Sequence, residues 1–201
     1  MDRKVRTMLE NLYHIFTDKY RDPLESWDKF LEFIALDNNP LLFSELNYNL
    51  QWFHDNKSFF DSIMSIYDSD LLRSDYYDHL GDMYHEIFPQ NTPIVNSLIK
   101  TSVPKTVLDS AAKTGRQLMA LYKSSPHTLL FGVEDDLRLY RIAYTNFLIH
   151  DIPGYLLHAD SSKHEINYST KEGKHNWKYY NKWNSCMNKL LPKCKNTTKI
   201  Q

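Results

Sequence analysis

The feature that most limits the fold is an alternation of short apolar runs with amphipathic segments in the second half of the chain. The apolar runs are 106–109, 128–134 and 155–160, and apolar residues recur at helical spacing over 115–122 and 137–150 between them. Strand, helix, strand, helix, strand at these lengths predicts a parallel sheet with crossover helices. The sequence therefore predicts an α/β fold.

The first 91 residues predict a helical region. Apolar residues recur every three or four positions over 1–36, and Pro23 suits a helix start, where its missing N–H costs little. Further helix is expected over 41–67 and 75–88. We therefore expect two parts, a helical region 1–91 and an α/β domain from residue 92 to residue 201.

Charge is unevenly distributed along the 201 residues, although the net charge is only −1. Residues 1–90 hold 8 Lys and Arg against 17 Asp and Glu, whereas residues 161–201 hold 9 against 2. An acidic front and a basic tail indicate surfaces with different partners. The tail is suited to the phosphates of nucleic acid, and equally to the acidic half of the protein itself.

Each of the three apolar runs ends in an acidic residue, namely Asp109, Glu134 and Asp160. The carboxyl ends of parallel strands meet at one edge of a sheet, where ligands bind. Three carboxylates there accept hydrogen bonds from an amine, a ribose diol and an exocyclic amino group, all of which an adenosine cofactor with an amino-acid tail offers. The alternative is that these residues end strands and cap helices.

Six short segments between about residues 80 and 160 resemble a known family in order and spacing. Leu80 to Glu86 is similar to a Leu-Gly-x-x-Tyr-Glu motif, and Thr92-Pro93 to a Thr-Pro-x-x-Val helix start. Val107 to Gly115 is similar to a segment with an Asp-Pro-Ala-Cys-Gly-Thr-Gly turn. Phe131 to Glu134 is similar to a Tyr-Gly-x-Glu motif. Asn146 to His150 is similar to Asn-Leu-x-x-His, and Ala159-Asp160 supplies a final acid. The chain thus resembles the N6-adenine DNA methyltransferases, especially the modification subunits of type I restriction systems.

The resemblance implies a reduced Rossmann-like domain that binds S-adenosylmethionine and acts on DNA adenine. In the family, the residue at the position of Glu134 binds the ribose of the cofactor. The residue at the position of Asp109 binds its methionine end, and the residue at the position of Asp160 binds its adenine. Thr92 would border the cofactor, and Gly115 would belong to the cofactor-binding turn. These five positions are the expected cofactor-binding residues.

Two departures from the family pattern bear on activity. Lys113 replaces the first glycine of the turn and Arg116 follows Gly115. Glycine tolerates positive φ, so a lysine predicts another backbone geometry or a cation aimed at the cofactor's carboxylate. The family's Asn/Asp-Pro-Pro-aromatic motif, which holds the flipped base, is not visible, and Asn184 is the nearest candidate by position.

These departures support a second hypothesis, a catalytically inactive relative. Such a module would bind nucleic acid or a restriction–modification partner, and a protein partner would supply the missing catalytic motif. A third possibility is that the resemblance extends only to the fold, because a fold does not imply a function.

The basic tail alternates lysines with aromatic residues. This pattern suits phosphate contact combined with base stacking. An amphipathic helix that packs its aromatic side chains on the sheet is the alternative. The candidate nucleic-acid-binding residues are Lys174, Trp177, Lys178, Tyr180, Lys182 and Trp183.

Membrane and metal partners are not expected. No run approaches the roughly 18 apolar residues that a membrane span requires, and we expect a cytoplasmic protein. The histidines show no metal-binding spacing. Asp135-Asp136 would suit a metal ion, but acids are also favoured at a helix N-terminus.

Overall fold

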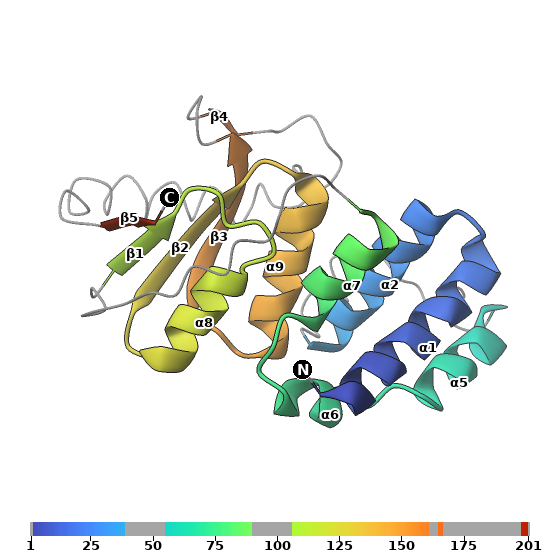
Figure 1. Ribbon diagram of the computed structural model, residues 1–201. Helices are drawn as coiled ribbons and strands as arrows, with labels where there is room; N and C mark the ends of the chain where they lie inside the picture. Colours follow the sequence, from blue (N-terminus) through green and yellow to red (C-terminus); the bar gives the residue numbers. More distant parts are fainter. Residues whose placement is uncertain (1, 39–54, 90–105, 161–164, 167–197, 201) are drawn as a thin grey trace.

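The computed structural model describes residues 2–38, 55–89, 106–160, 165–166 and 198–200. These residues form an α/β fold in which helices from the first half of the chain stand beside a small sheet (Figure 1). The prediction of an α/β fold with an N-terminal helical region is confirmed at this level.

Within the described residues, five helices precede the sheet. They are α1 (Arg3–Tyr20), α2 (Pro23–Asn38), α5 (Lys57–Met64), α6 (Ser69–Ser74) and α7 (His79–Ile87). Helix α2 begins at Pro23, as the sequence predicted. Of the helix expected over 41–67, residues 57–64 are helical, and residues 41–54 lie outside the described part of the chain.

Helix α7 begins four residues later than the predicted start at Asp75. Asp78 is its N-cap, because the Asp78 side chain accepts a hydrogen bond from the backbone N–H of Gly81 at 2.8 Å. Asp75 instead accepts hydrogen bonds from the Asp2 backbone N–H at 2.6 Å and from His79 Nε2 at 2.7 Å. The acid that caps the helix, and not the first acid in the segment, sets its start.

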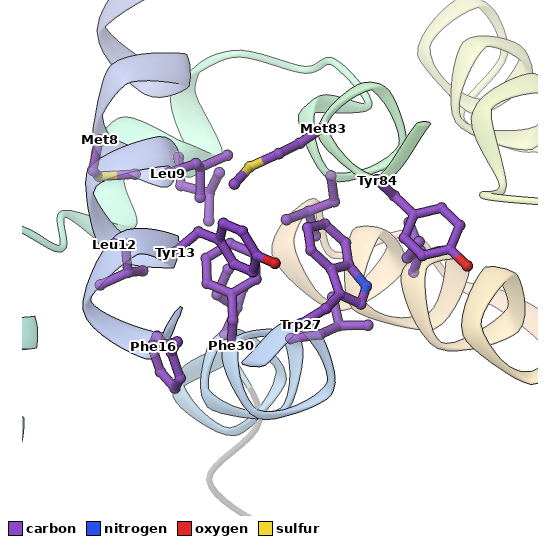
Figure 2. Close-up of a cluster of buried hydrophobic side chains, with 14 of the residues drawn as sticks. Met8, Leu9, Leu12, Tyr13, Phe16, Trp27, Phe30, Met83 and Tyr84 are labelled. Carbon is purple, nitrogen blue, oxygen red and sulfur yellow. The ribbon is translucent and has the colours of Figure 1, made fainter. Parts of the chain in front are cut away.

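An aromatic core holds the N-terminal helices together (Figure 2). Trp27 of α2 is fully buried, and its ring centroid lies 5.8 Å from that of Tyr13 on α1 and 5.4 Å from that of Tyr84 on α7. Phe16 and Phe30 meet edge to face at 5.9 Å. Such aromatic pairs contribute about 0.5–1.5 kcal/mol each beyond the burial of their surface.

The sheet has a parallel centre of three strands with two crossover helices. In chain order these elements are β1 (Thr106–Asp109), α8 (Arg116–Ser124), β2 (Leu129–Glu134), α9 (Leu137–Ile149) and β3 (Gly154–Asp160). Two short strands, β4 (Glu165–Ile166) and β5 (Thr198–Ile200), extend the sheet beside β3 and β1, giving the order β4-β3-β2-β1-β5. The predicted parallel pairing with crossover helices is confirmed.

Helix α9 contributes to two cores. Ile142 and Ile149 are buried with the N-terminal helices, whereas Phe147 is buried with residues of the sheet and α8. At the surface of the same contact, Asp28 of α2 lies 3.3 Å from Arg138 Nε of α9. The helical region therefore packs against α9, and α9 lies between it and the sheet (Figure 1).

Candidate functional site

The three strand-end acids lie along one edge of the sheet, and each lies further along the strand direction than the one before it. Asp109 is level with Gly132 of β2, and Glu134 is level with His158 of β3. Asp160 ends β3 two residues further on, and only its backbone is described. Parallel pairing thus brings together the carboxyl ends of the three predicted strands.

The turn between β1 and α8, residues 110–115, folds back over the end of β2. The Ala112 N–H donates to the Val133 carbonyl at 2.9 Å, and the Gly115 N–H donates to the Ala112 carbonyl at 2.8 Å. The Lys113 N–H donates to Glu134 Oε2 at 2.7 Å. The turn is therefore tied to the strand end that carries the expected ribose-binding acid.

Lys113 adopts the left-handed backbone conformation that glycine would adopt, with φ of 49°. The expectation of another backbone geometry at this position is therefore wrong. Gly115 also has positive φ, 78°, and a Cβ there would lie 3.2 Å from Ala143 Cβ and 3.3 Å from Phe147 Cε1. Glycine at 115 meets both a backbone and a packing requirement.

Glu134 is buried, with 6% of its surface exposed, and its carboxylate accepts hydrogen bonds from the loops that follow β1 and β2. Its Oε2 accepts from Lys113 N, and its Oε1 accepts from the backbone N–H of Asp136 at 2.9 Å. Burial raises the pKa of Glu134 to about 7, although the two backbone N–H groups act in the opposite direction. Each carboxylate oxygen uses one of its two lone pairs for a backbone N–H, and the neighbouring Asp135 carboxyl also hydrogen-bonds to Glu134 and acts to raise its pKa.

Asp109 is also buried, at 4% exposed. Its Oδ1 accepts from the Ala111 N–H at 3.1 Å. Burial raises the pKa of Asp109, while this hydrogen bond and the positive charge of Lys113 act to lower it. A cation of the chain therefore already acts on the carboxylate that was expected to bind the cofactor's amine.

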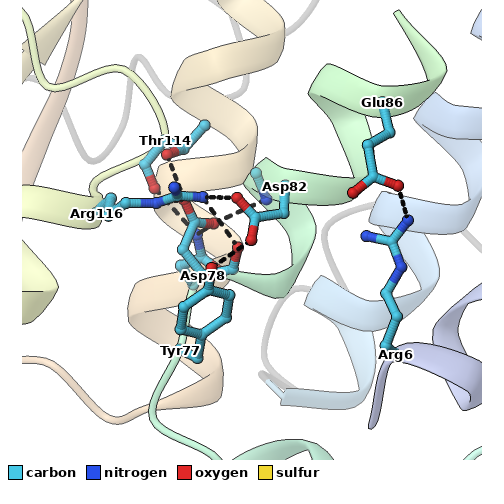
Figure 3. A network of polar contacts seen from close by, with 9 residues as sticks. Arg6, Tyr77, Asp78, Asp82, Glu86, Thr114 and Arg116 are labelled. Atoms are coloured by element: carbon cyan, nitrogen blue, oxygen red, sulfur yellow. Dashed lines mark hydrogen bonds and ion pairs between the residues drawn. The ribbon is translucent and has the colours of Figure 1, made fainter. Parts of the chain in front are cut away.

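Asp78 was not singled out from the sequence, yet it joins three segments at this site (Figure 3). Its Oδ1 accepts from Gly81 N at 2.8 Å and from Asn146 Nδ2 at 2.7 Å. Its Oδ2 accepts from Thr114 Oγ1 at 2.6 Å and from Arg116 Nε at 2.9 Å. Burial raises the pKa of Asp78, and the guanidinium of Arg116 is the strongest opposing influence.

Arg116 follows the turn and binds two acids of the helical region. Besides Asp78, it forms an ion pair with Asp82 of α7, and its guanidinium carbon lies 5.7 Å from the ring centroid of Tyr77. Tyr77 in turn donates its hydroxyl to Asp82. The departure from the family pattern at 116 therefore has a structural role in attaching α7 to the turn.

Asn146 brings α9 into the same network. Its Nδ2 donates to Asp78 and also to the Thr114 carbonyl at 3.0 Å. Asn146 is 1% exposed. It belongs to one of the six matching sequence segments, but nothing in the sequence indicates which groups its amide contacts.

Asp136 is the N-cap of α9, since its Oδ1 accepts from the N–H groups of Arg138 and Leu139. This is the helix-capping alternative for the Asp135-Asp136 pair. Within the ranges that the structure describes, no group of three or more His, Cys, Asp or Glu side chains is placed to hold a metal ion.

Several expected site residues lie outside the described part of the chain. They are Thr92, Lys174, Trp177, Lys178, Tyr180, Lys182, Trp183 and Asn184. Contact with DNA through the basic tail and a catalytic role for Asn184 therefore stay predictions. None of the described helices is long and apolar enough to cross a membrane.

Comparisons of the chain with protein-family models, with curated proteins and with solved structures find no match.

Proposed function

We propose that the carboxyl edge of the sheet binds S-adenosylmethionine, and that the chain is a Rossmann-like methyltransferase module with DNA adenine as its substrate. The observation that carries the proposal is the pair of left-handed residues at 113 and 115. The resembling family has glycine at both positions. Lys113 keeps this backbone although lysine disfavours it, which is expected where a turn must keep its shape.

The residues fit the cofactor at its ribose. The buried Glu134 carboxylate has its two oxygens fixed by backbone donors, and its remaining lone pairs would accept the ribose hydroxyls in competition with the Asp135 carboxyl. When bound, the cofactor would supply a methyl group activated by its sulfonium. Asp109 would accept hydrogen bonds from the cofactor's amine, in competition with the charge of Lys113.

The charge of Lys113 also favours a second candidate function, an inactive scaffold. A cation that already acts on Asp109 weakens the site for an ammonium and a sulfonium. The module would then keep the fold and serve as a binding partner for nucleic acid or for a restriction–modification protein, which would supply the catalytic motif.

Calorimetric titration with S-adenosylmethionine tests the cofactor site. We expect binding to the wild-type chain, and at least tenfold weaker binding to Glu134→Ala, because the ribose acceptor is lost. Asp61→Ala, which removes an exposed acid on α5, is the matched control and should bind as the wild type does. An absence of heat at millimolar cofactor would overturn the proposed site.

Methyl transfer separates the two functions. The active enzyme should transfer tritiated methyl groups to duplex or single-stranded DNA above background, and Asn184→Ala should abolish the transfer. Cofactor binding without transfer would support the inactive scaffold and would contradict the enzymatic proposal for the chain alone.

A further inference from the structure

We infer that Asp78 of the N-terminal helical region is a positioning residue that sets the shape of the turn 110–115. The inference deepens the proposed function and rests on it, because that turn is the proposed cofactor-binding turn. It follows that the helical region is part of the cofactor site and not an appendage.

The contacts of Asp78 use the whole acceptor capacity of its carboxylate. Each oxygen accepts two hydrogen bonds, and the four donors come from α7, the turn, the first residue of α8 and α9. A carboxylate has about four lone-pair sites. A buried acid with every site filled holds its partners in one arrangement, because loss of any donor leaves buried charge uncompensated.

Thr114 is the point at which this arrangement controls the turn. It stands between the two left-handed residues, Lys113 and Gly115. Its hydroxyl donates to Asp78, and its carbonyl accepts from Asn146. Thr114 is thus fixed on its side chain and on its backbone at once, and such double fixation is what retains a strained neighbouring residue.

Through Thr114 the effect reaches the proposed ribose-binding acid. With Lys113 held at positive φ, its N–H donates to Glu134 Oε2 at 2.7 Å. Without the Asp78 contacts, Thr114 keeps only the hydrogen bond from Asn146 to its carbonyl, so Lys113 is held less firmly in a conformation that lysine disfavours. The turn would then relax, and Glu134 would lose one of the two backbone donors that orient it.

Glu86 provides a matched control on the same helix. Asp78 caps the N-terminus of α7 and Glu86 lies in the last turn of this helix, and both carboxylates pair with an arginine. The partner of Glu86 is Arg6 of α1, and Glu86 faces away from the turn (Figure 3). Neutralising Glu86 removes one ion pair of α7 without touching residues 110–116.

The experiment compares Asp78→Asn with Glu86→Gln in the full chain. Amide hydrogen exchange of the turn and the dissociation constant for S-adenosylmethionine are measured for each. For Asp78→Asn we expect exchange at the Lys113 amide to accelerate at least tenfold more than exchange in α1 and α2, together with at least tenfold weaker binding. Glu86→Gln should stay within twofold of the wild type in both.

A second pair of variants covers the case in which Asp78→Asn does not fold. Thr114→Val keeps the shape of the side chain and loses the hydroxyl that donates to Asp78, whereas Thr114→Ser keeps the hydroxyl. We expect faster turn exchange and weaker binding for the valine variant, and rescue of both by serine. Equal behaviour of the valine and serine variants would overturn the inference.

The two readouts distinguish failure of the inference from failure of the proposed function. If the wild type binds the cofactor and Asp78→Asn binds equally well, the positioning role is overturned and the cofactor site stands. If the wild type does not bind, the proposed function is overturned, and exchange at residues 110–116 alone decides whether Asp78 sets the turn. Faster exchange spread evenly over the molecule would also overturn the inference.

Discussion

Lys113 occupies a backbone conformation that side chains other than glycine disfavour by about 1–2 kcal/mol. Its own N–H is fixed by Glu134, and the next residue, Thr114, is fixed by Asp78 and Asn146. The surroundings therefore determine the conformation of the residue, against its own preference. A single substitution at this position tests how much strain remains.

Lys113→Gly should raise the free energy of unfolding by about 0.5–1 kcal/mol, because the relief of strain exceeds the added freedom of the unfolded chain. Urea denaturation measures the change. The control is Lys4→Gly at an exposed position in the first turn of α1, which should lower stability by up to about 1 kcal/mol, the cost of glycine in a helix interior. A loss at 113 as large as the loss at 4 would contradict the prediction.

Glu134 makes stability depend on pH. Burial raises its pKa from the ordinary value of 4.5 to about 7, so the folded chain keeps a proton that the unfolded chain has released. Its contribution to stability is therefore present below about pH 4.5 and is lost as the pH rises towards 7, at up to about 1.4 kcal/mol per pH unit.

Glu134→Gln should remove this pH dependence. Urea denaturation of both chains at pH 5, 6, 7 and 8 measures it, and the wild type should lose stability relative to the glutamine variant between pH 5 and 7. Parallel pH profiles would show that Glu134 does not titrate in this range.

Among the elements, those between residues 106 and 160 follow their sequence pattern closely. The apolar runs end at acids and the helices begin at caps, so β1, β2 and α9 start or end within a residue or so of their predicted bounds. Helix α7 differs, because Asp75 and Asp78 are both suitable caps. Only the contacts of Asp75 with Asp2 and His79 show which acid is free to cap it.

Gly115 links two elements, since it is the N-cap of α8 and packs on α9. Gly115→Ala should lower the free energy of unfolding by about 2 kcal/mol, because alanine disfavours φ of 78° and its Cβ would press on Ala143 and Phe147. Thermal or urea denaturation measures the loss. Ala120→Gly, an ordinary exposed helix position of α8, should cost about 1 kcal/mol, and an equal cost at 115 would contradict the argument.

At the scale of the whole molecule, the sequence predicts a boundary between residues 91 and 92. It does not predict how the two parts pack against each other. The ion pair between Asp78 and Arg116 spans 38 residues, and the contact between Asp28 and Arg138 spans 110. Periodicity indicates which face of a helix is apolar, but it does not indicate which distant segment covers that face. For the same reason the strand-end acids were visible in the sequence, whereas Asp78 was not.

A shared core predicts that the described parts unfold together. Ile142→Ala on α9 should cost about 2–5 kcal/mol and should lower hydrogen-exchange protection by the same amount in α1, α2 and the three parallel strands. Met64→Ala, at a side chain 59% exposed, should change stability by less than about 0.5 kcal/mol. Loss of protection confined to the helices would indicate two independent units.

The double burial of α9 also has a consequence for biosynthesis. Helices α1, α2 and α7 leave the ribosome before α9, and Trp27 and Tyr84 belong to a core that Ile142 and Ile149 complete. Synthesis adds about 5–20 residues per second, so several seconds pass between the synthesis of α7 and that of α9. During that time the apolar surface of the earlier helices is not yet covered by α9. We expect the emerging N-terminal segment to be a chaperone client until residue 149 has cleared the exit tunnel.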